Sequence, residues 1–248
     1  MKLYKVRAVV LKSVNVQEAD QLLTLFSREK GKIRVIAYGA CKPNSRKRGA
    51  VQPFSHSQFL LRRGNGLDAV SQCELLEMFP ELRCRLDKLG YAVYLAELVD
   101  GVTAEEEPSE AVFELLLGAL RALGGADGEL LVRALEIKLL AILGYRPCLE
   151  SCVLCQGPIK GNEVVFHAGA GGVLCATCAE RNEGGLLCRR GTVELLRLLL
   201  RWDPGKLNQL QVGKIARREL KEVLRRHMEY HLDRRMKSTR FLELLEHV

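Results

Sequence analysis

Two short stretches, Cys152-Val153-Leu154-Cys155 and Cys175-Ala176-Thr177-Cys178, decide how the middle of the chain folds. Each stretch is a C-x-x-C pair, and 19 residues separate the two pairs. This spacing suits a tetrahedral Cys₄ zinc site, because each pair spans a tight turn that directs two thiolates at one ion. A short strand is expected at 163–167, and glycines that permit positive φ or close backbone approach stand nearby at Gly157, Gly169, Gly171 and Gly172. We therefore expect one structural Zn²⁺ ion, held by Cys152, Cys155, Cys175 and Cys178.

Other chemistry fits these cysteines less well. A redox C-x-x-C begins a helix after a strand, and neither pair has such a βαβ context. A zinc deaminase needs an H-x-E motif before P-C-x-x-C. Here no H-x-E lies upstream of Pro147-Cys148, and three residues instead of two separate Cys148 from the next cysteine, Cys152. Cys148 and Cys188 flank the site as spare thiols, and replacement of one ligand by Cys148 stays open. Four thiolates close the site to a catalytic water, so the zinc is expected to hold structure.

Length and composition bound the class of protein. The 248 residues suffice for one large domain or two to three small ones, and a hydrophobic content of 48% excludes wholesale disorder. No apolar run is long enough for a membrane span, and the strand-like pattern at the N-terminus predicts no signal peptide. Nine cysteines, an odd number, favour a reducing compartment over a disulfide framework, so a cytoplasmic protein is expected.

The net charge of +8 is unevenly distributed along the chain. Residues 1–75 carry +9, residues 76–188 carry −8 and residues 189–248 carry +7. A basic excess of this size in a small domain attracts a polyanion such as nucleic acid. A solvated surface tuned for solubility is the alternative.

Residues 4–75 read as a small β-barrel. Five short strands are expected at 5–11, 21–26, 32–37, 55–61 and 67–73, with no convincing helix between them. This count and size predict a five-stranded Greek-key barrel of OB type. An SH3-like barrel is the nearest rival, and periodicity alone does not separate the two.

The barrel carries a basic loop at 42–49, where Pro, Asn, Ser and Gly cluster with four cations. Lys32 and Arg34 share one face of their strand with Ile36. The candidate surface therefore comprises Lys32, Arg34, Lys42, Arg46, Lys47, Arg48, Arg62 and Arg63. Tyr38, Phe54 and Phe59 are possible stacking partners, although core packing is the better reading for Phe59. Such a face would follow a phosphate backbone through charge with little base specificity.

The rest of the chain is predicted to be helical around the zinc module. Helices are expected at 86–99, 109–123, 129–143, 192–201 and 212–232, with N-caps at Ser109 and Thr192 and ends at Gly144 and 202–205. The first three of these helices carry the acidic excess, which is expected on surfaces turned away from the barrel. The result is an α+β multidomain protein: an OB-type domain at 1–78, helical parts at 79–146 and 189–248, and the zinc module at 147–188.

The last helix has two distinct sides. It is expected to bury Val212, Ile215, Leu220, Val223, Leu224 and Met228. A second cationic surface, which could meet DNA or an acidic peptide, consists of Lys214, Arg217, Arg218, Lys221 and Arg225. His227 and His231 stand one turn apart but lack an H-E-x-x-H context, so they are interpreted as packing residues. The chain offers no Ser-His-Asp order, Walker loop or Rossmann fingerprint, and we expect no enzymatic activity.

Several local motifs now resemble one family. Gly39-Ala40 before the basic loop, Gln52-Pro53-Phe54-Ser55 after it, and Arg146-Pro147-Cys148-Leu149 before the cysteine pairs are similar to the bacterial RecO family of recombination mediators. Gly171-Gly172 before the second pair extends this resemblance over essentially the whole chain.

The resemblance implies an OB-fold domain, a helical domain and an embedded zinc module. It further implies binding of single- and double-stranded DNA, annealing of complementary strands, and work with RecR and the single-strand-binding protein SSB to load RecA near the nucleoid. It implies no membrane and no small-molecule substrate. The DNA surface would fall on the eight barrel cations, and the cationic face of the last helix is the candidate site for the acidic SSB tail.

Two other classes of protein remain. A zinc-ribbon adaptor would bind only protein, with its basic faces serving acidic partners. An enzyme acting on nucleic acid through unrecognised residues would turn over strand or base, but the closed Cys₄ site and the missing acidic clusters for divalent metals count against it.

Overall fold

The computed structural model describes residues 2–16, 18–201, 207, 209–232, 236, 238 and 242. The chain divides into two compact units, residues 1–124 with 236–248 and residues 125–235. The barrel thus shares its unit with two long helices, and the zinc module shares the other unit with three. The turn expected at 202–205 lies outside the described residues. No helix in these ranges is long and apolar enough to cross a bilayer.

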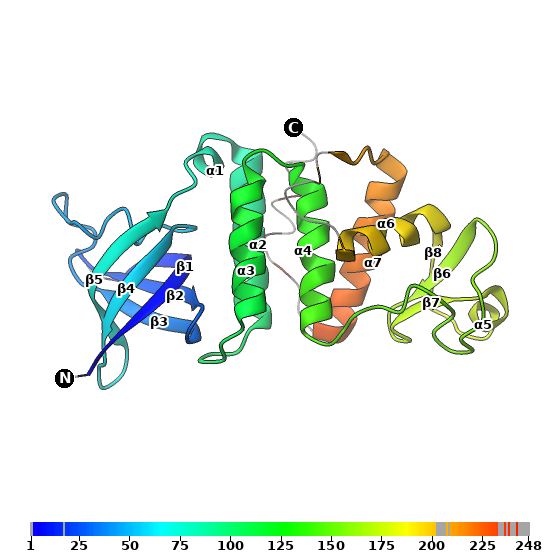
Figure 1. The fold of residues 1–248 in the computed structure, drawn as a ribbon, viewed down its shortest axis with the longest axis horizontal. Coiled ribbons are helices and arrows are strands. Elements are labelled where there is room, and N and C mark those ends of the chain that lie inside the picture. The colour runs from blue at the N-terminus through cyan, green and yellow to red at the C-terminus, as the bar shows by residue number, and fades with distance from the viewer. Residues whose placement is uncertain are drawn as a thin grey trace. The chain divides into compact units, whose positions relative to one another are not determined.

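A closed five-stranded barrel begins the first unit (Figure 1). Its strands are β1 (Leu3–Asn15), β2 (Gln21–Ser27), β3 (Gly31–Ala37), β4 (His56–Arg62) and β5 (Asp68–Glu77). They are hydrogen-bonded in the order β1-β2-β3-β5-β4, and only β3 and β5 pair in parallel. This order is that of an OB-like Greek-key barrel, so the predicted fold is confirmed over the SH3-like rival.

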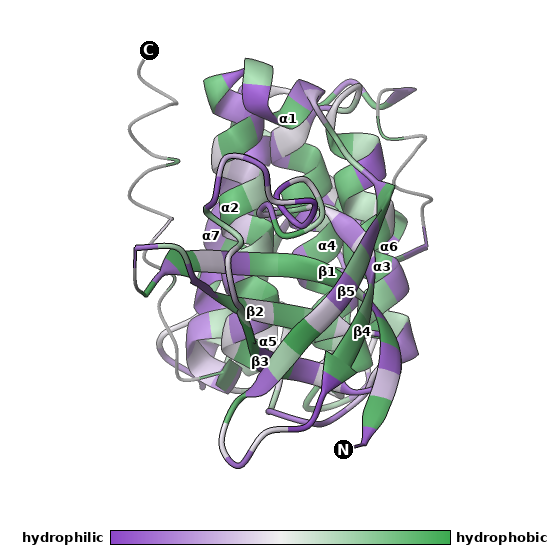
Figure 2. Ribbon diagram, turned by 90° about the vertical axis from the view of Figure 1, so that its left-hand side faces the viewer, coloured by the Kyte–Doolittle hydropathy of each residue, from purple (hydrophilic) through white to green (hydrophobic). Residues whose placement is uncertain are grey.

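The long strand β1 closes the barrel by pairing on both sides. Leu3–Val9 pairs with β4 and Ala8–Asn15 pairs with β2. A register shift between Val10 and Lys12 adds local twist, which lets one strand bend around the core. Hydrophobic and hydrophilic residues both occur along the strands (Figure 2). The buried apolar side chains form one core, in which Phe59 is fully buried, as expected.

Three helices complete the described part of this unit: α1 (Glu81–Cys84), α2 (Leu86–Val102) and α3 (Glu110–Leu123). The side chain of Ser109 accepts a hydrogen bond from Val112 N–H, so the predicted N-cap is confirmed. Glu77 of β5 accepts hydrogen bonds from Arg121 of α3, and this guanidinium lowers the pKa of Glu77 to about 2. The barrel and α3 are therefore joined by a charged hydrogen bond as well as by packing.

The prediction that the acidic excess faces away from the barrel is wrong. Asp100 at the end of α2 pairs with Lys32, and Glu105 in the α2–α3 connection pairs with Arg34. Arg28 in the β2–β3 turn pairs with Glu110 at the start of α3. The α2–α3 connection lies along β3, so opposite charges that are far apart in the sequence meet there.

The second unit is built on α4 (Gly128–Ile142), α6 (Arg190–Arg201) and α7 (Lys214–Leu232), which pack on one another. Asp127 caps α4 through Leu130 N–H. Gly144 follows α4 with φ of 88°, so the predicted glycine end is confirmed.

Two details of the last helices differ from expectation. Helix α6 begins at Arg190, so Thr192 is not its N-cap; Glu219 of α7 accepts instead from Arg189 N–H and from the Thr192 hydroxyl. The predicted burial of Ile215 is also wrong, since its side chain is 46% exposed, and Val212 precedes the helix. The apolar contact of α7 begins at Leu220, because its first turns are held by polar contacts of Arg217.

Candidate nucleic-acid interface and metal centre

A small three-stranded sheet carries the two cysteine pairs. It contains β6 (Glu163–His167), β7 (Gly172–Leu174) and β8 (Leu186–Arg189) in the order β7-β6-β8, and the short helix α5 (Ala176–Glu180) follows β7. The second pair spans the β7–α5 junction, with Cys175 immediately before the helix and Cys178 within it. The first pair lies in a turn closed by hydrogen bonds from Cys152 N–H to Gly157 O (2.9 Å) and from Gln156 N–H to Cys152 O (2.8 Å).

The four predicted ligands come together, with their Sγ atoms all within 4.8 Å of one another. Zinc–sulfur bonds of about 2.3 Å in a tetrahedron place the sulfurs about 3.8 Å apart. The Sγ atoms of Cys155 and Cys175, one from each pair, are 3.7 Å apart. Burial opposes ionisation of Cys152, but backbone N–H groups of its own turn and of Cys175 lower its pKa to about 6. The donor set and its geometry thus fit one metal ion of the size and preference of Zn²⁺.

The glycine before the second pair fixes how the two halves of the module meet. A Cβ on Gly172 would lie 2.2 Å from the carbonyl oxygen of Cys148, so only glycine fits there. Val173 N–H donates to that carbonyl (2.9 Å), and Cys148 N–H donates to Gly171 O (2.8 Å). Cys148 therefore serves this junction through its backbone, and its thiol lies outside the ligand cluster. Cys188 is buried in β8, where burial raises the pKa of its thiol to about 11.

The basic loop of the barrel is anchored beside Tyr38. The ammonium group of Lys47 donates to Tyr38 O (3.3 Å) and to Val70 O (2.8 Å), which ties the loop to the end of β3 and to β5. Lys42, Arg46 and Arg48 of the same loop are exposed. Among the predicted loop cations, Lys47 thus holds the loop in place while the other three face water.

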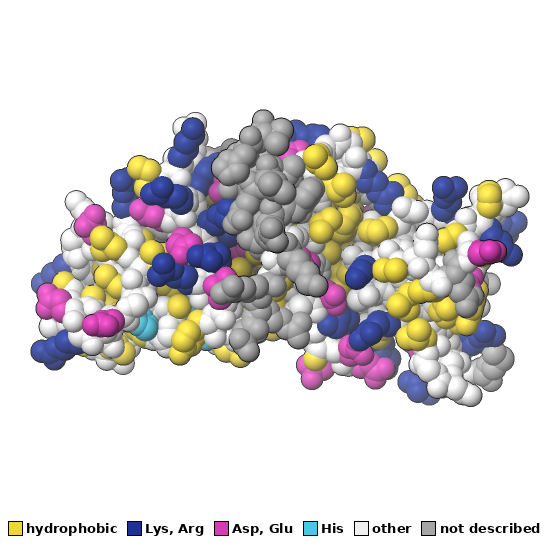
Figure 3. Space-filling view, turned by 180° about the vertical axis from the view of Figure 1, so that it is seen from behind, with side chains coloured by type: hydrophobic (Ala, Val, Ile, Leu, Met, Phe, Trp, Pro, Cys, Tyr) yellow, Lys and Arg dark blue, Asp and Glu magenta, His cyan; other side chains and the backbone are white. Residues whose placement is uncertain are grey.

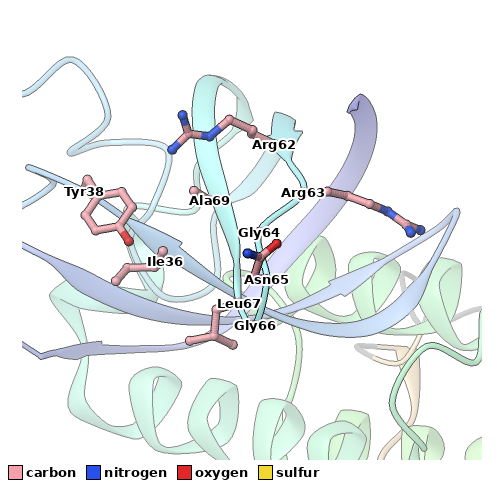
Figure 4. A pocket seen from close by; sticks show the side chains of 9 residues that line it. All are labelled: Ile36, Tyr38, Arg62, Arg63, Gly64, Asn65, Gly66, Leu67 and Ala69. Atoms are coloured by element: carbon pink, nitrogen blue, oxygen red, sulfur yellow. The ribbon is translucent and has the colours of Figure 1, made fainter. Parts of the chain in front are cut away.

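A pocket of about 620 Å³ opens next to this loop, between the end of β3 and the β4–β5 turn (Figure 4). It is lined by Ile36, Tyr38, Arg62, Arg63, Gly64, Asn65, Gly66, Leu67 and Ala69. Tyr38 is 51% exposed. In Figure 4 the Arg62 side chain extends toward Tyr38, whereas Arg63 points to the other side of the turn. An exposed aromatic ring beside a guanidinium can take a stacked base together with its phosphate.

Lys32 and Arg34 lie on the outer face of β3, as predicted, but neither is open. The Lys32 side chain is 13% exposed, and its ammonium donates to Asp100 O at 2.6 Å. The Arg34 guanidinium holds the carboxylate of Glu105, with Nε to Oε1 at 2.8 Å. The five remaining predicted cations, Lys42, Arg46, Arg48, Arg62 and Arg63, are exposed and make no ion pair within the described ranges. Phe54, offered as a stacking partner, is buried.

The cationic face of α7 divides into bound and open side chains. Arg217 pairs with Asp127 and Glu129 at the start of α4, and Arg225 pairs with Glu222 and Glu229 of its own helix. Lys221 is partly buried, whereas Lys214 and Arg218 are exposed beside Ile215. His227 and His231 pack as interpreted, His227 against the ring of Phe166 and His231 on that of Tyr145.

The surface seen in Figure 3 shows cationic side chains interspersed with acidic ones. The sequence did not reveal which carboxylates neutralise the cations of β3 and α7. They are Asp100 and Glu105, which pair with β3, and Asp127 and Glu129, which pair with α7. The run of three acids at Glu105-Glu106-Glu107, between two basic regions, was a usable signal for these contacts.

Two family models match almost the whole chain. Residues 1–79 match the family described as Recombination protein O N terminal, and residues 83–240 match Recombination protein O C terminal. A DNA repair protein RecO of Pelotomaculum thermopropionicum is 48% identical over 98% of this chain and 94% of its own length. Those of Desulforamulus reducens and Moorella thermoacetica are 46% and 40% identical, over 99% and 97% of this chain and 96% and 90% of their own lengths. The chain therefore belongs to the RecO family of DNA repair proteins.

Proposed function

We propose that this protein binds single- and double-stranded DNA through its OB-like barrel, anneals complementary strands, and helps to load RecA on SSB-coated DNA together with RecR. The observation that carries the proposal is the open basic surface around Tyr38. There an anchored loop, an exposed ring and the Arg62 side chain adjoin one pocket. We refer to this region as the open surface, and its cations are Lys42, Arg46, Arg48, Arg62 and Arg63.

The chemistry of the open surface suits a flexible phosphate backbone. Five exposed cations attract phosphates and release the counterions condensed on the nucleic acid, which favours binding without reading the sequence. Tyr38 offers a face on which any base can stack, and Leu67 adds an exposed apolar side chain at the pocket rim. Gly64 and Gly66 bring the backbone of the β4–β5 turn close to a bound strand.

The proposed mechanism is physical and needs no catalytic group. Neutralising phosphates on a bound strand lowers the repulsion that opposes its approach to a complement. Contact with SSB would raise the local concentration of the protein on coated strands. The Cys₄ module would contribute a rigid, zinc-held structure beside α6 and α7 and no chemistry of its own.

The proposed SSB contact lies on the first turns of α7. Lys214 and Arg218 are exposed there on either side of the exposed Ile215, a combination that suits an acidic peptide with apolar residues. Arg217 and Arg225, predicted for the same role, already hold carboxylates, so the proposal narrows to the open pair.

The proposal is tested by annealing two complementary oligonucleotides, both coated with SSB, with and without the protein. We expect acceleration that weakens as salt rises, and a loss of at least half of that acceleration in the double variant Arg46→Gln/Arg48→Gln. Lys160→Gln/Arg181→Gln, which removes two exposed cations from the zinc module, is the matched control. Unchanged annealing in the loop variant would show that the DNA surface lies elsewhere.

The same samples separate the other two classes of function. An adaptor that binds only protein would neither bind bare oligonucleotides at physiological salt nor accelerate annealing. A nucleic-acid enzyme would change the length or the bases of the strands, which is detected by denaturing electrophoresis and mass spectrometry of the recovered DNA.

A further inference from the structure

An acidic segment, Glu105-Glu106-Glu107, covers the part of β3 that carries Arg34. It connects α2 to α3 and follows β3 like a short extra strand, because Glu106 N–H donates to Lys32 O (2.9 Å) and Glu105 pairs with Lys32 in parallel. The carboxylate of Glu105 accepts from both Nε and Nη2 of Arg34. Both donors meet the same carboxylate oxygen, so an anionic group on the outer face of β3 already occupies the guanidinium that a phosphate could use.

The segment is closely fitted to the barrel. A Cβ on Gly31 would lie 2.0 Å from Glu107 O, so the glycine of the β2–β3 turn leaves just enough room for it. Glu106 has φ of 59°, a left-handed conformation that is unfavourable for a non-glycine residue. Such strain persists only where surrounding contacts impose it, which lowers the cost of releasing the segment.

The contact between Arg34 and Glu105 is easily exchanged. Their side chains are 57% and 52% exposed, and ion pairs with this exposure add little to stability. Lys32 differs, since its buried ammonium is bound by both the carbonyl and the carboxylate of Asp100. Displacing the acidic segment would therefore free Arg34 and leave Lys32 in place.

Arg34 lies on the path of a strand bound at the open surface. Ile36 lines the pocket beside Tyr38, and Arg34 is the next residue along the same outer face of β3. Successive residues on one face of a strand are about 7 Å apart, so a backbone leaving the pocket along β3 reaches Arg34 next.

We propose that Glu105-Glu106-Glu107 is an internal competitor for nucleic-acid phosphate, and that Arg34, now paired with Glu105, is a further phosphate-binding position that becomes available when the segment is displaced. The ligand is the phosphodiester backbone, without regard to base. This inference rests on the proposed function, because it assigns a gated extension to the same surface.

The test is a double-mutant cycle in the full-length, zinc-loaded protein. Binding of a fluorescent single-stranded oligonucleotide is measured by anisotropy over a range of salt for Glu105→Gln, Arg34→Gln and the double variant. Glu105→Gln is expected to bind three- to tenfold more tightly, about the effect of one freed charge contact, with a salt slope steeper by about 0.7. Arg34→Gln alone should bind like the wild type, and the double variant should return to the wild-type affinity and slope.

Glu74→Gln is the control, since it removes one negative charge from an exposed position of β5, beyond its pairing with β3. If Glu105→Gln matches Glu74→Gln in affinity and slope, the competitor does not exist. If the gain persists when Arg34 is also replaced, the gain is a general charge effect and Arg34 is not the position. Failure of the proposed function looks different, because binding would then be absent or indifferent to the loop variant Arg46→Gln/Arg48→Gln.

Discussion

His227 shows how a single buried side chain can make the second unit sensitive to acid. Burial lowers its pKa to about 4, a hydrogen bond between Nε2 and Tyr145 O (2.9 Å) partly opposes this, and His231 adds to the depression. The unfolded chain takes up this proton near pH 6.5, so between pH 6.5 and 4 the unfolded state binds more protons than the folded one. The stability of residues 125–235 should therefore fall as the pH falls through that window.

His227→Gln should remove most of this acid sensitivity. For the wild type we expect a loss of about 2 kcal/mol between pH 7.5 and pH 5 from this residue. The variant keeps an amide donor for Tyr145 O, so its stability should change less over the same range. Denaturant unfolding of both proteins at each pH measures the difference, and any contribution of the Cys₄ cluster is common to both proteins and cancels. Parallel pH profiles would rule out His227 as the source.

The neighbours Arg217 and Arg218 form a matched pair with opposite expected effects. Arg217 binds two carboxylates at the start of α4, and its hydrogen bond, opposed by burial, keeps the pKa of Asp127 below its usual range. Arg217→Ala should cost about 1–2 kcal/mol of stability. Arg218→Ala should leave stability within about 0.5 kcal/mol but weaken binding of an SSB tail peptide. Thermal melting measures the stability of each variant, and calorimetric titration measures its affinity for the peptide. If Arg218→Ala lowered stability and Arg217→Ala lowered peptide affinity, the two residues would have the opposite roles.

At the scale of elements, the zinc module should depend on its metal while the barrel does not. The cluster of Cys152, Cys155, Cys175 and Cys178 joins the turn of the first pair to the β7–α5 junction when a metal is bound. The barrel belongs to the other compact unit. A chelator should therefore raise hydrogen exchange across residues 145–188 and leave β1 to β5 protected. An unchanged melting profile of metal-free protein would contradict this structural role.

Cysteine variants test which thiols are ligands. Cys178→Ser should lose stoichiometric zinc, because it removes one corner of the tetrahedron. Cys148→Ser should retain zinc, since Cys148 acts through its backbone against Gly171 and Val173. Metal analysis of the purified variants measures their zinc content. Loss of zinc in Cys148→Ser would mean that Cys148 replaces one of the four ligands, the alternative that the sequence leaves open.

At the scale of the whole molecule, net charge overstates the number of cations that can meet DNA. The sequence suggests eight barrel cations, but Lys32, Arg34 and Lys47 hold protein atoms. Five open cations predict a slope of log K against log salt of about −3.5 for single strands, from about −0.7 for each contact. A slope near −6 would mean that all eight engage phosphate, and a slope near zero would remove the barrel from the interface.

The local parts of this fold could be predicted from neighbouring residues. Ser109 and Gly144 mark helix ends because a cap or a left-handed residue acts within a few positions. Thr192 looked like a cap by the same reasoning, but Glu219 of another helix supplies that contact. Competition from a distant residue is invisible to a local rule.

The sequence by itself determined the Cys₄ site and the five alternating strands, because spacing and periodicity act over a few residues at a time. Its local motifs also resemble the RecO family, to which matches over nearly the whole chain assign it. Only the tertiary structure decided the strand order, with its parallel β3–β5 pair, and which cations stay open. Arg34 meets Glu105, and Arg217 meets Asp127, across long stretches of chain. Charge is a property of composition, but its availability depends on which opposite charge the fold brings within hydrogen-bonding distance.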